Sequence, residues 1–227
     1  MDISLFYEER GTGFPLVLLH GNGESHEYFA RQMEVFSQHF RVLAPDTRGH
    51  GCSPRGEGAF TLRRFADDLY DFLRARGIAR AHILGFSDGG NIALYFALAH
   101  PEMVDHLILN GANLCPAGVK QRYQWPNEIG YRVAKAFAGK SEQARLHVET
   151  LALMVNEPDL TPEQLHTLPM PTLVLAGTRD MIRRAHTEEI ARAIPHATVV
   201  FLSGNHFVAA GNPKAFNAAV LDFLREP

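Results

Sequence analysis

The sequence predicts an α/β fold: a mostly parallel sheet of about seven strands, helices on both faces and a small helical insertion. The first observation behind this prediction is that short, continuous apolar runs alternate with longer stretches of helical spacing. Such runs are typical of parallel sheets buried on both faces, because every parallel crossover brings its own helix. The second observation is that glycines and polar residues directly follow several of the runs. They are therefore expected at the carboxyl ends of the strands, where open parallel sheets bind their ligands.

The expected elements follow one another in order along the chain. Strands are expected near residues 3–7, 14–19, 41–44, 81–86, 104–109, 172–176 and 198–202. Helices are expected at residues 25–39, 61–76, 88–100, 185–194 and 213–224. In the second of these, Phe65, Leu69 and Phe72 recur at helical spacing. Gly77 is a suitable stop for that helix, and Pro101 for the next one.

One segment interrupts this alternation. Between residues 112 and 168 no strand-like run occurs, and apolar residues recur at helical spacing instead. We therefore expect a core domain of residues 1–111 and 169–227, with a helical cap insertion at 112–168 over the carboxyl edge of the sheet. Apolar cap residues either line an acyl pocket or pack the cap onto the core; they include Trp125, Phe137, Leu151 and Met154. The cap also carries basic residues that either bind a substrate carboxylate or belong to solvated faces: Arg122, Arg132 and Arg145.

Composition excludes several classes of protein. The 22 basic and 25 acidic residues give a net charge of −3, which argues against a general nucleic-acid binder and against a polybasic membrane anchor. The first residues lack the basic and apolar regions of a secretory signal, and no run of 18 apolar residues occurs. We therefore expect a cytoplasmic protein without a nucleic-acid or membrane partner, whose oligomeric state the sequence leaves open.

Cysteine and histidine usage bears on metal binding. The two cysteines, Cys52 and Cys115, exclude a disulfide scaffold and a cysteine-based zinc module. There are 12 histidines, but the nearest pairs are six residues apart, so none has the spacing that places two imidazoles on one helix face. We expect no metal and no other cofactor, although a site assembled from distant segments stays open.

The sharpest motif is Gly85-Phe86-Ser87-Asp88-Gly89, between an expected strand and an expected helix. In that context the pattern G-x-S-x-G predicts a nucleophile elbow, a tight turn that exposes the serine hydroxyl at the end of the strand. The alternative is a glycine-rich helix start that packs closely or binds a phosphate. We interpret Ser87 as a catalytic nucleophile.

A serine hydroxyl needs a base and an orienting acid, which elbow folds supply after later strands in the order acid, histidine. Asp180 follows the strand expected at 172–176, and His206 follows the strand expected at 198–202. Taken singly, Asp180 could cap a helix and His206 could be an ordinary loop residue. In some elbow folds the acid instead follows the strand after the elbow helix. Here that position is Asn110, which carries no charge. The joint pattern predicts a triad of Ser87, His206 and Asp180.

Acyl transfer also needs donors for the oxyanion. One is expected to be the backbone N–H of Asp88, the residue after the nucleophile. The other is expected to be the backbone N–H of Asn22, in the segment His20-Gly21-Asn22-Gly23. Since Asn22 would act through its main chain, its substitution is expected to be tolerated. His20 is expected to be a structural residue.

With these motifs in place, the chain resembles the α/β-hydrolases over nearly its whole length. The segments 20–23, 45–53, 85–90, 177–180 and 204–207 occur in the family's order. The resemblance implies that segment 45–53, with Asp46, Arg48 and His50, is a structural turn. Ser-Asp-Gly-Gly at 87–90 is similar to the biphenyl-hydrolase-like (valacyclovirase-like) branch. Only one strand-like run precedes residues 16–19, so the resemblance implies seven strands rather than the family's eight.

Together, the motifs and the resemblance predict a serine hydrolase that cleaves a small carboxylic ester, or a related acyl bond, through an acyl-enzyme. The substrate is expected to be a small molecule. The family implies alternatives on the same triad: hydrolysis of carbon–carbon, thioester or amide bonds, and lyase chemistry. Serine at position 87 argues against dehalogenases and epoxide hydrolases, which have aspartate there. A weakly catalytic ligand-binding receptor is the alternative from another class.

Overall fold

The structure, a computed structural model that describes residues 2–225, contains a seven-stranded sheet in the order β1-β3-β2-β4-β5-β6-β7. Strand β1 runs antiparallel to β3, and every other neighbouring pair is parallel, which confirms the predicted sheet. The strands are β1 Tyr7–Arg10, β2 Pro15–Leu19, β3 Arg41–Pro45, β4 Ala81–Phe86, β5 Val104–Asn110, β6 Thr172–Gly177 and β7 Ala197–Leu202.

The first strand begins later than the expected residues 3–7. The backbone N–H of Phe6 donates to the Ser53 hydroxyl at 2.9 Å, so this part of the chain pairs with a loop rather than with β3. Pairing with β3 starts only at Tyr7, opposite Pro45. Apolar content indicated an extended segment, but it did not indicate which neighbour would receive its backbone hydrogen bonds.

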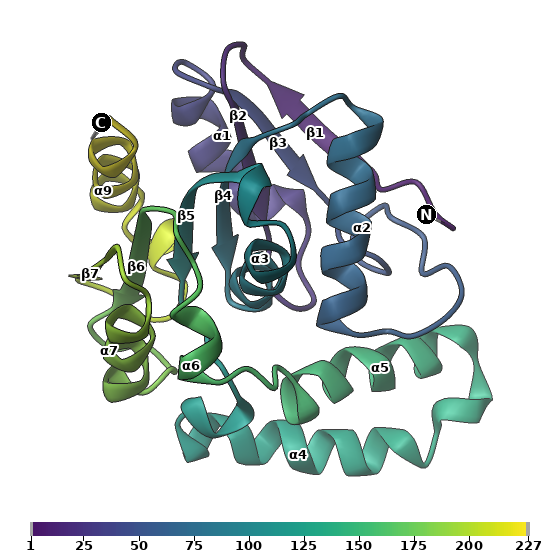
Figure 1. Cartoon of the computed structure of the whole chain (residues 1–227). Coiled ribbons are helices and arrows are strands. Elements are labelled where there is room, and N and C mark those ends of the chain that lie inside the picture. The colour runs from purple at the N-terminus through teal and green to yellow at the C-terminus, as the bar shows by residue number, and fades with distance from the viewer. Residues whose placement is uncertain (1, 226–227) are drawn as a thin grey trace.

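Helices cover both faces of the sheet (Figure 1). On one face lie α1 Ala30–Phe36, α8 Val208–Gly211 and α9 Pro213–Arg225, and on the other α2 Leu62–Ala75, α3 Asp88–Ala99 and α7 Arg184–Ala193. Strand residues alternate between these faces. In β2, Leu16 and Leu18 pack on the face covered by α1, α8 and α9, and Val17 and Leu19 pack on the face covered by α2, α3 and α7. The predicted helix at 25–39 is split into a 3-10 turn, η1 His26–Phe29, and α1.

Segment 45–53 is held by buried polar contacts. Arg48 is fully buried, and its guanidinium donates two hydrogen bonds of 2.7 Å to the Asp68 carboxylate of α2. Asp46 accepts from the backbone N–H groups of His26 and Cys52. His20 Nε2 accepts from the backbone N–H of residue 47 at 3.0 Å. Because unpaired polar groups are costly to bury, these bonds fix the loops beside the strand ends.

Between β5 and β6 the chain leaves the sheet for a helical segment. It contains η3 Pro116–Gly118, α4 Gln121–Lys135, η4 Ala138–Lys140, α5 Glu142–Asn156 and α6 Pro162–Leu165. Figure 1 shows α4 and α5 lying side by side across the edge of the sheet to which the parallel strands point. No helix in residues 2–225 is long and apolar enough to cross a membrane.

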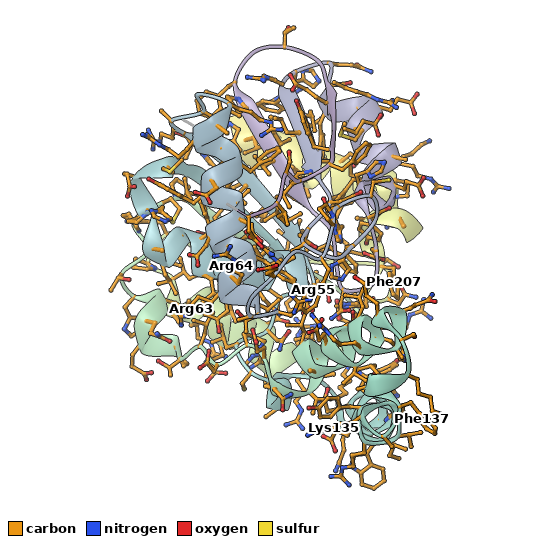
Figure 2. All side chains as sticks on the ribbon, turned by 90° about the vertical axis from the view of Figure 1, so that its right-hand side faces the viewer. Arg55, Arg63, Arg64, Lys135, Phe137 and Phe207 are labelled. Atoms are coloured by element: carbon orange, nitrogen blue, oxygen red, sulfur yellow. The ribbon has the colours of Figure 1, made fainter. Side chains whose placement is uncertain are left out.

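Helix α4 differs from expectation in what its apolar face contacts. Trp125, Ile129 and Val133, spaced four residues apart, are 58–60% exposed, and Phe137 beyond the helix is 45% exposed. Figure 2 shows Phe137 and Lys135 at the end of α4, far from the sheet. Trp125 and Phe137 therefore neither line a pocket nor pack the helices onto the core. Helical spacing indicated an apolar face, but not that the face would be turned outward.

Candidate active site

Ser87 occupies a strained turn between β4 and α3. It is the one non-glycine residue with a positive φ in residues 2–225, with φ 53° and ψ −120°. Conformations of this kind cost about 1–3 kcal/mol and persist where the surroundings hold them. Here the Ser87 N–H donates to the Asn110 carbonyl of β5 at 2.8 Å. A Cβ at Gly89 would lie 2.0 Å from the Leu19 carbonyl oxygen, so only glycine allows this approach of α3 to β2.

The loops after β6 and β7 bring the other two predicted residues to Ser87. His206 Nε2 lies 3.0 Å from Ser87 Oγ, and His206 Nδ1 lies 2.7 Å from Asp180 Oδ1. The His206 and Asp180 side chains are both more than 90% buried. The three residues thus form one hydrogen-bonded chain although they are up to 119 positions apart.

The Asp180 carboxylate is held in its ionised form. Burial alone would raise its pKa, but the contacts with His206 and hydrogen bonds from the backbone N–H groups of Ile182 and Gly177 outweigh burial and lower the pKa. A charged acceptor at 2.7 Å favours the tautomer of His206 that carries its proton on Nδ1. The lone pair of Nε2 is then left to accept the Ser87 hydroxyl proton.

The two residues expected to supply oxyanion donors lie beside this chain. Neither the Asn22 nor the Asp88 backbone N–H has an acceptor in the described residues. Asn22 Nδ2 donates to Asp88 Oδ2 at 2.8 Å and to the Thr150 carbonyl of α5 at 3.0 Å. The Asn22 side chain therefore ties both predicted donors together and links them to α5. These bonds argue against the expectation that substitution of Asn22 is tolerated.

A small cleft with a cavity volume of about 50 Å³ opens at the Ser87 and His206 side chains. Its polar lining comprises Asn22, Asp88, Asn113, Gln124, Asn127 and Glu157, and its apolar lining Val119, Met154, Met181 and Ile182. Of the cap residues expected at a pocket, only Met154 is among these. Apolar atoms nevertheless make up most of the exposed lining, so the cleft combines an apolar surface with a few polar side chains.

Three carboxyl groups near the cleft have raised pKa values. Burial raises the pKa of Asp88, which accepts hydrogen bonds from Asn22 and Asn91. Burial also raises the pKa of Glu157, whose carboxylate accepts from the Leu62 N–H at 2.7 Å. Burial raises the pKa of Glu24 to about 7. The sequence analysis missed Glu24 and Glu157, because no motif marks them and their burial depends on the fold.

Comparison with known proteins agrees with this geometry. Residues 15–150 match the model of the alpha/beta hydrolase fold family. The chain is 30% identical to 2-hydroxymuconate semialdehyde hydrolase of Pseudomonas putida over 251 residues, covering 96% of this chain and 89% of that protein.

Two solved structures are similar over nearly the whole chain. The enol-lactonase from Burkholderia xenovorans LB400 has a TM-score of 0.83 at 26% identity, covering 99% of this chain and 97% of that one. A thermophilic esterase from Thermogutta terrifontis also has a TM-score of 0.83 at 26% identity, with 98% and 93% covered. Because the family model matches more than half of this chain, the chain belongs to the alpha/beta hydrolase fold family.

Proposed function

We propose that the protein is a serine hydrolase that cleaves a small carboxylic ester, or a related acyl bond, through an acyl-enzyme. The observation that carries this proposal is the hydrogen-bonded chain from Ser87 Oγ through His206 to Asp180, with contacts of 3.0 and 2.7 Å. Both distances are within hydrogen-bond reach, the first requirement for a nucleophile and its base.

In the proposed reaction, His206 Nε2 takes the Ser87 proton as Oγ attacks the carbonyl carbon. The same imidazole then returns that proton to the leaving alcohol, which departs and leaves the acyl group on Ser87. In the second half, His206 activates a water molecule that releases the acid. Asp180 holds the imidazole through Nδ1–H and stabilises the imidazolium that forms twice in each cycle.

We assign the oxyanion donors to the backbone N–H groups of Asn22 and Asp88. Fixed donors aimed at the developing charge need no reorganisation during the reaction, which makes them effective. The 2.8 Å bond between the two side chains supports this assignment, because it restrains both residues together. Asp88 is also the first residue of α3, so the positive end of the helix dipole favours negative charge there.

We further propose that residues 112–168 act as the cap of a core formed by 1–111 and 169–227. Gln124, Asn127, Met154 and Glu157 contribute to the cleft from α4, α5 and the following residue. The small volume of the cleft favours small acyl or alcohol groups over long aliphatic chains, and its few polar side chains can orient hydrogen-bonding atoms of the substrate.

A carbon–carbon bond hydrolase is the second candidate. The resemblance to 2-hydroxymuconate semialdehyde hydrolase supports it, and the resemblance to an esterase and an enol-lactonase supports the ester proposal. Fold and triad do not separate the two, since specificity depends on the cleft and the cap. A substrate panel separates the two candidates, since a carbon–carbon hydrolase should cleave a vinylogous diketone and show little activity on simple aryl esters.

The test combines covalent labelling with an ester series. Wild-type protein should be labelled by a fluorophosphonate, and Ser87→Ala should lose both labelling and ester turnover while keeping its far-UV circular dichroism spectrum. Among p-nitrophenyl esters, acetate should be cleaved with a higher kcat/KM than octanoate. Unchanged labelling of Ser87→Ala would overturn the nucleophile assignment. Turnover of the diketone alone would replace the ester proposal by the carbon–carbon one.

A further inference from the structure

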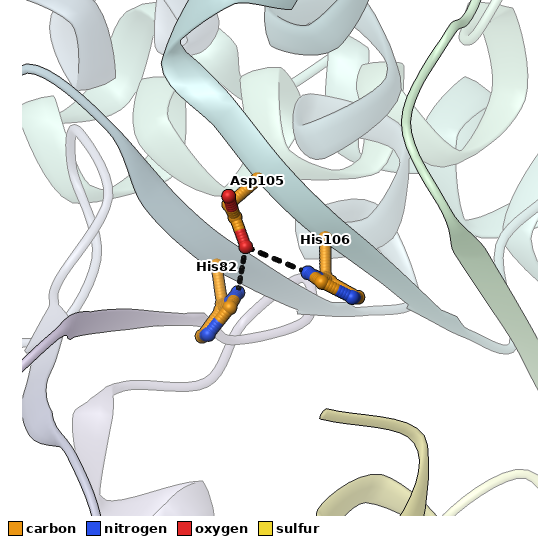
Figure 3. A group of neighbouring side chains, drawn as sticks. All are labelled: His82, Asp105 and His106. Carbon is orange, nitrogen blue, oxygen red and sulfur yellow. Dashed lines mark hydrogen bonds and ion pairs between the residues drawn. The ribbon is translucent and has the colours of Figure 1, made fainter. Parts of the chain in front are cut away.

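A second cluster of chemically active side chains lies at the opposite end of the sheet from Ser87. His82 of β4 and Asp105 and His106 of β5 point toward one another (Figure 3). Asp105 Oδ2 lies 3.2 Å from His82 Nδ1 and 2.7 Å from His106 Nδ1. All three atoms lie within 4.8 Å of one another. The cluster thus gathers two imidazole nitrogens and one carboxylate oxygen around one point.

A bulge in the sheet brings these side chains together. In the pairing of β4 with β5, Ala81 lies opposite Val104, but Ile83 lies opposite Leu107. One residue of β4, His82, therefore faces two residues of β5, Asp105 and His106. Neighbouring residues on a regular strand point to opposite faces, whereas a bulge lets two neighbours share one face. Bulges are structural features rather than defects, and this one assembles the cluster.

His82 has an unsatisfied nitrogen within the cluster. Its side chain is 7% exposed, and its Nδ1 has no hydrogen-bond partner in the described residues, since the contact with Asp105 lacks hydrogen-bond geometry. The rings of Phe14 and Phe40 pack against the His82 ring, with centroids 4.7 and 5.5 Å away.

We propose that His82 Nδ1, Asp105 Oδ2 and His106 Nδ1 bind a divalent transition-metal ion of the zinc type, with water as the fourth ligand. Zinc bonds to imidazole nitrogen and carboxylate oxygen of about 2.0–2.2 Å place tetrahedral ligand atoms about 3.3 Å apart. The two contacts to Asp105, 2.7 and 3.2 Å, are close to that spacing. Binding requires both imidazoles to carry their proton on Nε2, so only a small rearrangement separates the cluster from a coordination site.

Arg80 determines how tightly such an ion is held. Its guanidinium lies 3.1 Å from Asp105 Oδ1, the carboxylate oxygen that the proposed ion does not use. The pair orients the carboxylate, but its positive charge opposes a second cation nearby. The Arg80 side chain is 56% exposed and free to turn toward solvent. Removing the arginine charge should therefore strengthen metal binding, the opposite of removing a ligand.

The site is separate from the proposed chemistry. His82 precedes Ser87 by five residues along an extended strand, which places them about 16 Å apart at 3.3 Å per residue. An ion at His82 joins β4 to β5 at their amino-terminal ends and does not reach the substrate cleft. Its expected effect is to stabilise the folded chain by mass action, leaving ester turnover unchanged.

The test is a titration of chelator-treated full-length protein with Co²⁺, followed by visible absorption, and with Zn²⁺, followed by melting temperature. Wild-type protein should bind one Co²⁺ with the strong visible bands of a four-coordinate ion, which Zn²⁺ displaces, and Zn²⁺ should raise the melting temperature. Asp105→Asn and His106→Gln, at half-buried positions, should each weaken binding at least tenfold. Arg80→Gln should tighten it several-fold.

Two control variants make the outcome decisive. His166→Gln removes an exposed imidazole outside the cluster and should change nothing. Cys52→Ser removes the exposed thiol, the main competing ligand, and should leave the spectrum intact. Wild-type protein that binds neither ion at 100 μM overturns the proposal. The proposal is also overturned if binding survives both Asp105→Asn and His106→Gln, or if binding is lost when Cys52 or His206 is substituted. In either case the three side chains are only a hydrogen-bonded cluster.

Discussion

The core and the α4–α5 helices meet at the cleft, but they are built differently. Around Ser87 the core positions each group by several bonds: the elbow is tied to β5, and Asp180 accepts from two N–H groups besides His206. Helix α4, by contrast, exposes Trp125, Ile129 and Val133. The helical segment that contains α4 and α5 is joined to the core by apolar contacts of Leu153 and Leu160 and by hydrogen bonds such as that from Asn22 to the Thr150 carbonyl. Under the proposed function, the core therefore supplies the chemistry, and the cap adjusts which substrates reach it.

The largest expected effect comes from the core. Asp180→Asn should lower kcat by about 10⁴, because a neutral amide no longer fixes the His206 tautomer or stabilises the imidazolium. The matched cap variant is Glu157→Gln, which changes a half-buried carboxyl at the cleft. It should lower kcat less than tenfold. Steady-state kinetics on one short ester compares the two, and equal losses would contradict the division of roles between core and cap.

The second effect arises where the two regions meet. Asn22→Ala removes the bonds to Asp88 and to the Thr150 carbonyl, so the oxyanion loop is less restrained. Loss of one oxyanion donor costs about 3 kcal/mol, and a loosened donor should cost less, so we expect kcat to fall about tenfold. Asn22→Asp tests the same position, since it keeps the size but places two carboxyl groups together. A kcat within twofold of wild type in Asn22→Ala would show that the side chain does not position the donor.

How much of the structure and of the candidate site can be predicted from the sequence differs between the core and the cap. The hydrogen-bonded chain of Ser87, His206 and Asp180 was predictable because each member follows an apolar strand, and parallel strands bring their carboxyl ends to one edge. The role of the Asn22 side chain was not, because its partner Thr150 lies 128 positions away on a helix whose docking no local pattern sets. The same holds for His82, whose partners depend on a bulge that shifts pairing by one residue. Hydrophobic periodicity and motifs identify helices, strands and site residues, whereas helix docking and strand register depend on the folded structure.

The third effect is a pH dependence of stability that belongs to the core. Burial raises the pKa of Glu24 from 4.5 to about 7, so the folded chain holds this proton more tightly than the unfolded one. Stability from this group is fully present below pH 4.5 and is lost as the pH rises to about 7. Glu24→Gln should remove that loss and be more stable than wild type at pH 8 by about 1–2 kcal/mol, since water screens this partly exposed carboxyl. Urea unfolding at pH 5 and pH 8 measures it, and an identical pH dependence in both proteins would exclude Glu24 as its source.

The smallest effect tests how the cap is attached. Arg55, in the loop after segment 45–53, donates two hydrogen bonds of 2.7 and 2.9 Å to Glu149 of α5, and Figure 2 shows Arg55 beside that helix. Arg145, within α5, reaches the same carboxylate at 3.4 Å but is 57% exposed. One carboxylate thus serves a contact between the regions and a contact inside the cap. Double-mutant cycles of Glu149→Gln with Arg55→Gln and with Arg145→Gln separate the two contacts.

The Arg55 cycle should give a coupling of about 1 kcal/mol in unfolding free energy, because the pair is bidentate and largely shielded from water. The Arg145 cycle should give at most about 0.5 kcal/mol, as for exposed pairs one helical turn apart. Arg55→Gln should also raise KM severalfold at unchanged kcat, since α5 contributes to the cleft but not to the triad. If kcat fell and KM stayed constant, the attachment of the cap would be part of the catalytic geometry, and the separation of the two regions would fail at this point of contact.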